Sequence, residues 1–491
     1  MALATRTGVE KPSKWAVLGI VGTGVFMCTL DSSIVNVSLP AIAKYFGAPV
    51  GSEVEWVIIA YLVIIASTLL TVGRLADRIG HRPIWLAGLA VFTTGSALCG
   101  AAPALWLLIA ARVLQGIGGS LLMAVSPAML TSAFPPDERG RALGLNSTIV
   151  ALGISAGPAL GGWITETASW RWIFYVNLPI GIGGAVATML VLPRPQRKPG
   201  KRFDVAGAVL LGVSLASLTT LLSIGTDAGW TSPIALGLAV TAVIAFGVFA
   251  WHETRHEAPL LDHQLFQNRL FAWATASLVL SFLAGFAVSF VLPIYLEQLR
   301  GFTPAKTGLL LTPFPLVVAI VAPISGHTAD RIGTRWLAAA GMTVLCAGLL
   351  LLSRLDEHTS LAGVIWPQLV AAFGMALFQS PNNSAIMGAA PKDRQGVAAG
   401  MLATGRTMGQ SISVAIAGAV FVGLGAATAG RALLHTPHDP QLARTFVHGF
   451  QWALRTCAAI SAAAIVTSLL RGNEREARQS REIAAQPAAA R

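Results

Sequence analysis

Asp31 is the residue of this chain that most directly suggests chemistry, because it stands near the middle of the first long apolar segment. A carboxylate near the centre of a bilayer is costly, usually functional, and tends to face the interior of a helix bundle or a cavity. Such a group can bind and release a proton as a cavity opens alternately to each side of a membrane. We therefore predict that Asp31 couples proton movement to transport. The alternative is a half-buried structural carboxylate beside the polar side chains of Ser32 and Asn36.

Arg112 and Arg406 add two positive charges within apolar segments, and Gln115 follows Arg112 by one helical turn. A buried arginine keeps its charge and must find a carboxylate, carbonyl groups or water. We predict that Arg112 pairs with Asp31 and competes with the proton, with backbone carbonyls as its alternative partners. Arg406 could attract an anionic part of a substrate, or it could pair with Glu297 or a helix end; the sequence leaves these alternatives open.

The chain that positions these residues is too apolar for a soluble protein of 491 residues. Hydrophobic residues make up 54% and charged residues 11%, where a soluble chain has about 25% charged residues, and the mean hydropathy is +0.67. Runs of about 20 apolar residues match the thickness of a bilayer, and their lack of alternation indicates helices rather than a barrel. The fourteen predicted spans are 15–38, 54–72, 83–101, 105–131, 142–164, 172–192, 204–224, 232–251, 270–296, 306–325, 336–352, 362–388, 397–424 and 449–470.

The net charge of +12 is explained by topology. If the loops alternate between two sides, 24 of the 34 Lys and Arg residues fall on the side of the N-terminus, 7 on the other side and 3 within spans. The positive-inside rule then places both termini in the cytoplasm of a bacterial inner-membrane protein. The basic excess therefore predicts no nucleic-acid partner. The basic residues 1–14 run directly into the first span, which indicates an uncleaved anchor.

An internal repeat divides the chain into two halves. The segment 73–82 reappears as 326–335, and later Pro, Asp, Gly and Ser positions reappear at offsets of 254 to 256. Parallel repeats of six helices are typical of transporters with a ligand site at midplane between the halves. We predict an N-terminal six-helix bundle at 1–192, a linker with two inserted spans at 193–269, a C-terminal six-helix bundle at 270–470 and a basic cytoplasmic tail at 471–491. We expect Asp31 to lie in the cleft between the bundles.

The repeated loops supply candidate gate residues. Their acidic side chains can pair between the halves or cap neighbouring helix N-termini, where a carboxylate is favoured, and their glycines permit close approach or positive φ. Contacts of this kind would break as the cytoplasmic side opens, whereas the alternative is retention of positive loops for topology alone. The predicted gate residues are Gly73, Asp77, Arg78, Gly80, Arg82, Asp330 and Arg331.

Gly153, Gly157 and Gly161 recur every four residues and therefore share one face of the fifth predicted span. Small residues at this spacing allow helices to touch closely in lipid, and Pro158 removes one backbone hydrogen bond and can kink the helix. This face is predicted to seal the pathway while allowing the halves to rock. Tight packing without a mechanistic role is the alternative.

Several motifs together resemble the fourteen-span drug:proton antiporter family of the major facilitator superfamily. They are the segment Leu30–Pro40, the loop Gly73–Arg82, the motif Arg112–Gly116, the motif Gly153–Gly162 and the segment Trp170–Gly181. The resemblance implies an all-α membrane protein with two six-helix bundles and an inserted helix pair. It also implies proton-coupled export of lipophilic drugs or toxic small molecules, driven by the proton gradient with no cofactor. Relatives of this kind can work with a periplasmic adaptor and an outer-membrane channel, and the loop 425–448 is a candidate contact for such a partner.

A promiscuous pocket needs few fixed polar groups and several adaptable apolar ones. The candidate pocket residues are Asn36, Gln115, Gln379, Asn382, Asn383, Arg406, Trp56, Tyr61, Met123 and Tyr295. For each aromatic residue alone, packing against lipid or the core is the commoner role. The histidines fall in loops or at span ends, and no metal-binding or catalytic motif appears, so the sequence predicts no metal site and no enzyme. A permease or exporter of one specific metabolite is the main alternative to a drug exporter, because fold alone does not separate import from export.

Overall fold

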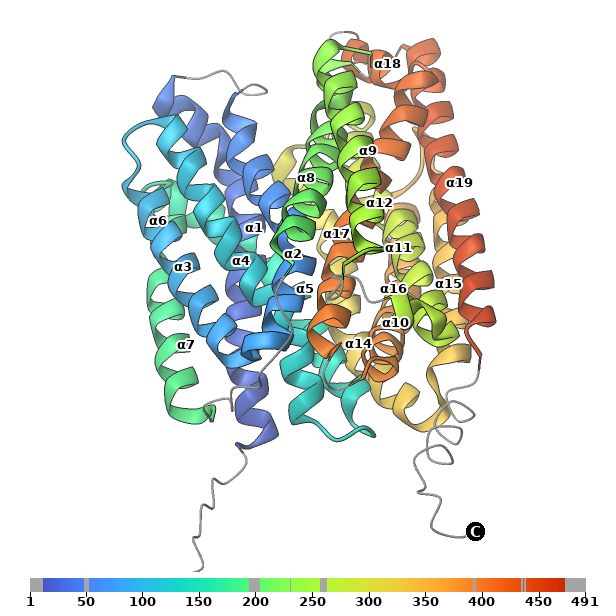
Figure 1. Cartoon of the computed structure of the whole chain (residues 1–491). Helices are drawn as coiled ribbons and strands as arrows, with labels where there is room; N and C mark the ends of the chain where they lie inside the picture. Colours follow the sequence, from blue (N-terminus) through green and yellow to red (C-terminus); the bar gives the residue numbers. More distant parts are fainter. Residues whose placement is uncertain are drawn as a thin grey trace, which may run out of the picture.

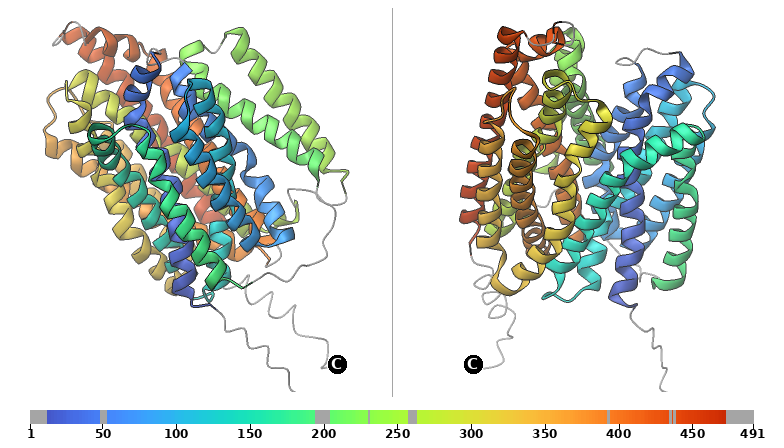
Figure 2. Two further views of the ribbon diagram at one scale, coloured as in Figure 1. Left: turned by 90° about the vertical axis from the view of Figure 1, so that its left-hand side faces the viewer. Right: turned by 180° about the vertical axis from the view of Figure 1, so that it is seen from behind.

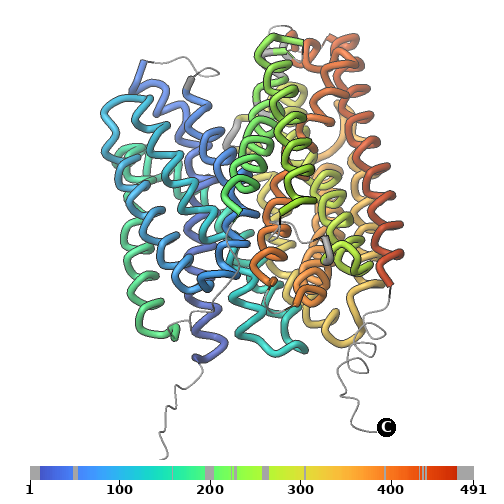
Figure 3. The backbone as a smooth tube through the Cα atoms, viewed as in Figure 1, coloured from blue at the N-terminus to red at the C-terminus, as the bar shows by residue number. Residues whose placement is uncertain are grey.

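The computed structural model describes residues 12–47, 53–193, 204–229, 231–256, 263–391, 394–433, 436 and 439–472, which fold into long helices arranged as two halves side by side (Figures 1 and 3). The helices of the first half are α1 (Lys14–Phe46), α2 (Trp56–Ile79), α3 (His81–Ala101), α4 (Leu105–Ala133), α5 (Arg139–Thr167), α6 (Trp172–Tyr175) and α7 (Asn177–Val191), with a 3₁₀ turn at Glu53–Glu55. Helices α8 (Val205–Ala228) and α9 (Pro233–Glu253) form an additional antiparallel pair.

The second half begins with a short helix and continues through a further set of spans. Its helices are α10 (His263–Gln267), α11 (Arg269–Gly285), α12 (Ala287–Ile294), a π-helical turn at Tyr295–Leu299, α13 (Pro304–Leu311), α14 (Pro313–Ile332), α15 (Thr334–Leu352), α16 (Leu361–Ala389), α17 (Gln395–Gly423), α18 (Ala426–Leu433) and α19 (Pro440–Leu470). Helix α1 begins and helix α19 ends on the same side of the molecule, which lies at the bottom of Figure 1 and is called the terminal side below.

Thirteen crossings in the described residues are long and apolar enough to span a membrane. Helix α17 is not among them; it has the same length of 29 residues as α16 and carries Arg406 and Gln410. Counting α17, the architecture agrees with the prediction of fourteen spans. The pair α8–α9 packs at the edge where α2 and α17 meet (Figure 2), and Leu70 of α2 forms a small apolar cluster there with Leu211 and Phe249.

Two predicted boundaries differ from the structure because packing extends the helices. The first span is predicted to end at residue 38, but α1 continues through Pro40 to Phe46. Ile42 and Ala43 are buried in an apolar cluster with Trp170 and Phe174, which stabilises these last turns.

The stretch 425–448, predicted as a loop, is also largely helical in the described residues. It contains α18 and the first turns of α19. Asp439 caps α19 by accepting hydrogen bonds from the backbone N–H groups of Gln441 and Leu442, and Pro440 occupies the first turn, where its missing N–H is harmless. Phe446 then packs edge-on against Phe421.

Two crossings of the second half are broken within their length. The ninth crossing changes from α11 to α12 at Phe286, and the tenth changes from α13 to α14 at Thr312, directly before Pro313. Proline cannot continue the backbone ladder of the preceding turn, which accounts for the second break. Both breaks lie beside a cavity between the halves, described below.

Candidate functional site

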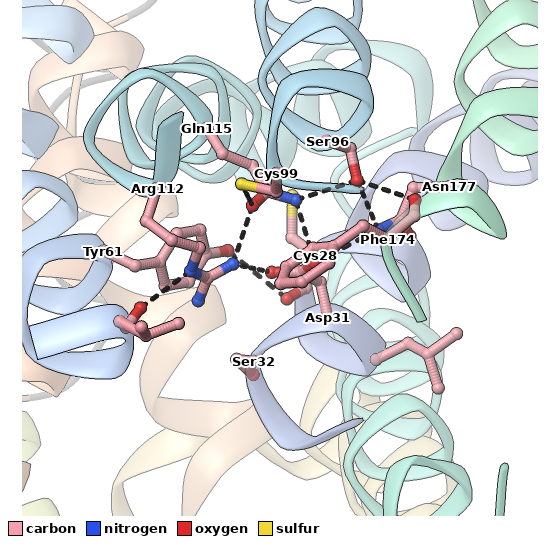
Figure 4. Close-up of polar contacts among 12 residues, drawn as sticks. Cys28, Asp31, Ser32, Tyr61, Ser96, Cys99, Arg112, Gln115, Phe174 and Asn177 are labelled. Atoms are coloured by element: carbon pink, nitrogen blue, oxygen red, sulfur yellow. Dashed lines mark hydrogen bonds and ion pairs between the residues drawn. The ribbon is translucent and has the colours of Figure 1, made fainter. Parts of the chain in front are cut away.

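A buried ion pair lies inside the first half (Figure 4). Asp31 of α1 is 0% exposed and Arg112 of α4 is 1% exposed, and Arg112 Nη1 donates to Asp31 Oδ2 at 2.6 Å. Gln115, one turn after Arg112, donates from Nε2 to Asp31 Oδ1 at 2.8 Å and accepts from Arg112 Nη1 at 2.7 Å. The three side chains therefore form a closed hydrogen-bonded ring.

Arg112 has further contacts that hold its guanidinium in place. Its Nε donates to the carbonyl oxygen of Val57 at 2.8 Å, and its charged carbon lies 4.1 Å from the centre of the Tyr61 ring. Charge-assisted hydrogen bonds and a cation–π contact are strong in a dry environment. A buried charge pair of this kind is stable only when such additional partners satisfy it.

Asn177 and Ser96 complete the surroundings of the carboxylate. Asn177 Nδ2 donates to Asp31 Oδ1 at 3.1 Å and to Ser96 Oγ at 3.0 Å, while Ser96 itself donates to the carbonyl of Phe174 at 2.8 Å. Sequence reasoning assigned no role to either residue. Asn177 belongs to the segment Trp170–Gly181 on which the resemblance to fourteen-span exporters partly rests, whereas Ser96 is indistinguishable from other small residues of the third span.

The charge state of Asp31 follows from these partners. Arg112, Gln115 and Asn177 all present N–H donors to its oxygens, which is the environment of an ionised carboxylate. The ion pair with Arg112 depends on the negative charge of this carboxylate.

The prediction that Asp31 lies in the cleft between the bundles is wrong for this conformation. Its carboxylate points toward α4 and α7 inside the first half, and it does not line the cavity between the halves. The cause is the set of donors supplied by α4 and α7, which satisfy the carboxylate better than an apolar cavity could. In this conformation a molecule in the cavity would therefore not contact the Asp31 carboxylate.

A cavity of about 310 Å³ lies between α5 of the first half and helices of the second half. Its apolar wall includes Phe282, Phe286, Phe314 and Met375, and its polar groups include Gln368, Gln379, Gln410 and Arg406. Such a mixture of aromatic surface with a few convergent polar groups is typical of small-molecule sites. Of the residues predicted for a substrate pocket, Gln379 and Arg406 line this cavity.

The other predicted pocket residues lie elsewhere. Gln115 hydrogen-bonds to Asp31, and Tyr61 packs against the guanidinium of Arg112. Tyr295 is buried against Phe450 and donates to the carbonyl of Asp356. Asn382 donates to the carbonyl of Ala274 and accepts from the guanidinium of Arg471. The remaining ones that do not line the cavity are Asn36, which is exposed on α1, Asn383 on α16, Trp56 at the start of α2, and Met123, which packs against the core of the first half. Polarity or aromatic character in a span did not reveal which way each side chain points.

Helix α5 packs against α1 beside the ion pair and also lines the cavity. A Cβ on Gly153 or Gly157 would overlap the side-chain oxygen of Thr29 or Ser33, and Ser33 Oγ donates to the carbonyl of Gly153 at 3.2 Å. The glycine face therefore packs on the turns of α1 that flank Asp31, and Gly161 continues this contact onto Ile34. The adjacent residues Ile154 and Ser155 line the cavity. The side chain of Pro158 lies outside the described part.

The two halves are fastened on the terminal side by two equivalent aspartates. Asp77, at the end of α2, accepts hydrogen bonds from the N–H groups of Gly396 and Val397 at 2.6 and 2.9 Å, at the start of α17. Asp330, at the end of α14, accepts from the N–H groups of Gly140 and Arg141 at 2.9 and 3.1 Å, at the start of α5. Each aspartate thus caps a helix of the opposite half, where a carboxylate is favoured.

Glycines make these two contacts possible. A Cβ on Gly73 would overlap the carbonyl oxygen of Gly396, and one on Gly326 would overlap that of Gly140. Gly80 and Gly333 both have φ of 96°, in the region that favours glycine. Of the predicted gate arginines, Arg82 donates to the carbonyl of Met189 within the first half, and Arg78 and Arg331 lie in the last turns of α2 and α14.

Comparison with known proteins identifies the family to which this arrangement belongs. A family model described as Major Facilitator Superfamily matches residues 21–414 and 274–491. The chain belongs to this superfamily. Among its relatives in the superfamily, the multidrug resistance protein Stp of Mycobacterium tuberculosis is 36% identical over 421 residues, covering 85% of this chain and 78% of that protein. The riboflavin transporter RibZ of Clostridioides difficile is 35% identical over 409 residues, covering 83% and 88%.

A solved structure of the same superfamily shows the same fold. The human organic anion transporter MFSD10 aligns with a TM-score of 0.67 at 17% sequence identity, covering 93% of this chain and all of the other. With the family match and the candidate spans of the described residues, the protein is a multi-pass membrane transporter of the major facilitator superfamily.

Proposed function

We propose that this protein is a proton-driven antiporter that exports lipophilic small molecules across the cytoplasmic membrane, with both termini in the cytoplasm. The carrying observation is the buried Asp31–Arg112 pair, which is separated from the cavity but linked to it through α5. The similarity to the multidrug resistance protein Stp supports drug-like substrates. The excess of Lys and Arg in the loops of the terminal side supports the orientation.

In the proposed cycle, the arrangement described here is the state closed on the cytoplasmic side. Asp77 and Asp330 hold that side shut, and Asp31 is ionised and paired with Arg112. A proton arriving from the outer side neutralises Asp31 and releases Arg112, which keeps Val57 and Gln115 as partners.

Separation of Asp31 from Arg112 then affects the shape of the cavity through side-chain packing. The turns of α1 that carry Thr29 and Ser33 adjust against the glycine face of α5, and α5 moves with them. The start of α5 is held by Asp330, so movement of this helix loosens one of the two caps. The cytoplasmic side opens, the proton leaves, and a substrate enters beside Gln379 and Arg406. Re-formation of the Asp31–Arg112 pair returns the loaded protein to the outward state.

A transporter of one specific metabolite is the second candidate. The similarity to the riboflavin transporter RibZ, at nearly the same identity as to Stp, favours it. A periplasmic adaptor and an outer-membrane channel remain predicted partners, for which α18 and the start of α19 are the outward-facing candidates in the proposed orientation.

Export and its dependence on Asp31 are tested together in an efflux-deficient host. Wild type, Asp31→Asn and Arg112→Ala are compared for protection against a panel of lipophilic toxic compounds, and for substrate-driven proton release in inverted vesicles. We expect wild type to protect and both variants to lose proton-coupled transport. Equal protection by wild type and Asp31→Asn would exclude Asp31 as the coupling group, and protection against a single metabolite analogue alone would favour the second candidate.

A further inference from the structure

The three arginines within the spans predicted from the sequence have very different surroundings. Arg112 has a carboxylate, an amide and a carbonyl as partners. Arg455 is exposed on the outer face of α19 and donates to Gln451 at 3.3 Å. Arg406 is half-buried in the wall of the cavity. Its guanidinium carbon lies 5.5 Å from the centre of the Phe282 ring, and no ion pair with Arg406 is found among the described residues.

Arg406 therefore carries a positive charge without a protein counter-charge in the described part of the chain. Glu297 forms no ion pair with it there, and the residues that line the cavity include no Asp or Glu. Arginine cannot lose its proton, and a charge at membrane depth without a partner is costly. The guanidinium of Arg406 can be solvated by water in the cavity or paired with an anionic group of a bound molecule.

The internal repeat shows that this charge belongs to one half alone. The position equivalent to Arg406 in the first half is Val150, and both residues line the same cavity. Gln379 and Gln410 line the same cavity as Arg406 and can donate further hydrogen bonds, while Phe282, Phe286 and Phe314 offer aromatic surface. The cavity thus combines one positively charged group with an aromatic wall against which a ring can pack.

We propose that the cavity recognises amphipathic aromatic monoanions, with Arg406 binding their carboxylate, sulfonate or phenolate group. The proposal rests on the export function above and narrows its substrate class. Arginine donates two parallel hydrogen bonds to a carboxylate, and the low dielectric of the cavity strengthens this contact relative to water. Organic cations meet an uncompensated like charge at the same place and are disfavoured.

The test uses three probes with the same ring and different charge: 1-naphthoate, 1-naphthamide and 1-naphthylmethylammonium. Equilibrium binding is measured on the purified full-length protein in detergent for wild type, Arg406→Gln, Arg406→Lys and the matched control Arg455→Gln. Wild type is expected to bind naphthoate most tightly and the ammonium probe least. Arg406→Gln should lower naphthoate affinity roughly ten- to a hundredfold, from the usual strength of a charged hydrogen bond, and leave naphthamide affinity within about twofold.

Arg455→Gln should behave as wild type, and Arg406→Lys should retain part of the preference because it keeps the charge but loses the planar fork. Unchanged naphthoate binding by Arg406→Gln, or a preference of wild type for the ammonium probe, would overturn the proposal. If Arg406→Gln loses naphthamide as well, Arg406→Lys decides: a retained preference for naphthoate supports the anion site, and equal affinity for acid and amide excludes it.

Transport of the same probes separates this inference from the function on which it rests. Proteoliposomes carrying a proton gradient are loaded with naphthoate or naphthamide, with Asp31→Asn as the reference. Arg406-dependent naphthoate binding without gradient-driven movement of either probe would keep the anion site and overturn export. If the gradient drives movement of naphthamide but naphthoate binding does not depend on Arg406, export is supported and the anion site is overturned.

Discussion

The carboxylate of Asp77, on α2, accepts a hydrogen bond of 2.6 Å from the backbone N–H of Gly396, the second residue of α17 in the other half. The same contact is repeated between Asp330 and Gly140, with the halves exchanged. The internal repeat has thus produced two caps that cross the interface in opposite directions. Each cap satisfies helix N–H groups that would otherwise need water or another partner, so the closed state of this side is stabilised by both.

Asp77→Asn should shift the protein toward the conformation open on the terminal side. An asparagine still accepts one hydrogen bond but loses the charge that the helix N-terminus favours, a difference of about 1 kcal/mol, or roughly fivefold in population. Distances between spin labels on the terminal ends of α2 and α17 measure this shift. Ser132→Ala, an exposed residue in the last turn of α4 on the same side, is the control, and an unchanged distance distribution in Asp77→Asn would contradict the gate.

Gly157→Ala should impair transport much more than Gly162→Ala. A Cβ at Gly157 overlaps Ser33 of α1, whereas a Cβ at Gly162 meets no atom within 4 Å. Both substitutions lie in α5 and change its helix propensity equally, so only the contact with α1 separates them. Overpacking of this kind costs about 1–3 kcal/mol. Thermal unfolding in detergent and vesicle transport are the measurements, and equal behaviour of the two variants would remove the α1–α5 contact from the mechanism.

Asn177→Ala should impair proton-coupled transport more than Asn177→Ser. Asn177 donates hydrogen bonds to Asp31 Oδ1 and to Ser96 Oγ, so alanine removes both bonds, whereas serine keeps a shorter donor at the same place. Substrate-driven proton release in inverted vesicles measures the difference. Transport by Asn177→Ala equal to that of wild type would show that Asn177 is not needed to position the Asp31 carboxylate.

Asp204 provides a pH-dependent contribution to stability at the start of α8. Burial tends to raise the pKa of its carboxyl, but the N–H of Gly207 and the side chains of His252 and His256 outweigh this and hold the pKa below its usual value of 3.8. His252 Nε2 lies 3.0 Å from Asp204 Oδ1. A lowered pKa in the folded state means that the contribution is present above pH 3.8 and is lost as the pH falls through the folded-state value.

Asp204→Asn should accordingly lower the unfolding temperature at neutral pH, by the equivalent of up to about 1 kcal/mol for the negative charge lost at the N-terminus of α8. The difference from wild type should shrink as the pH is lowered below 3.8. Scanning calorimetry of the purified protein between neutral and acidic pH measures this convergence. A difference that stays constant throughout would mean that the carboxylate charge does not stabilise the α8–α9 pair.

The sequence predicts the ion pair better than the cavity. Asp31 and Arg112 stand out because charge is rare in spans, and the one-turn spacing of Gln115 places it beside Arg112. A charge in lipid has few ways to be satisfied, so its partner can be inferred. Ser96 and Asn177 escape this reasoning because neutral polar residues in spans have many possible partners.

The cavity lining depends on how two separately folded halves meet, which local patterns do not encode. Gln379 could be inferred as a polar residue in a span, but Asn382, only three residues later, points to the other side and binds Ala274. Phe286 and Thr312, at which two spans are broken, also line the cavity, and a break of this kind changes which face of a span meets the cavity. The same limit explains why Asp31 was expected in the cleft: its position along α1 could be predicted, but its rotation about the helix axis could not.

The uncompensated charge of Arg406 has a consequence for the energetics of export. In a one-to-one exchange, a proton moving inward and a monoanion moving outward both carry current in the same direction, equal to two elementary charges per turnover. Each charge gains about 2.3 kcal/mol per 100 mV of membrane potential. An anionic cargo would therefore be driven by voltage twice over, so that the transporter could continue to concentrate it outside the cell even where the pH is equal on both sides of the membrane.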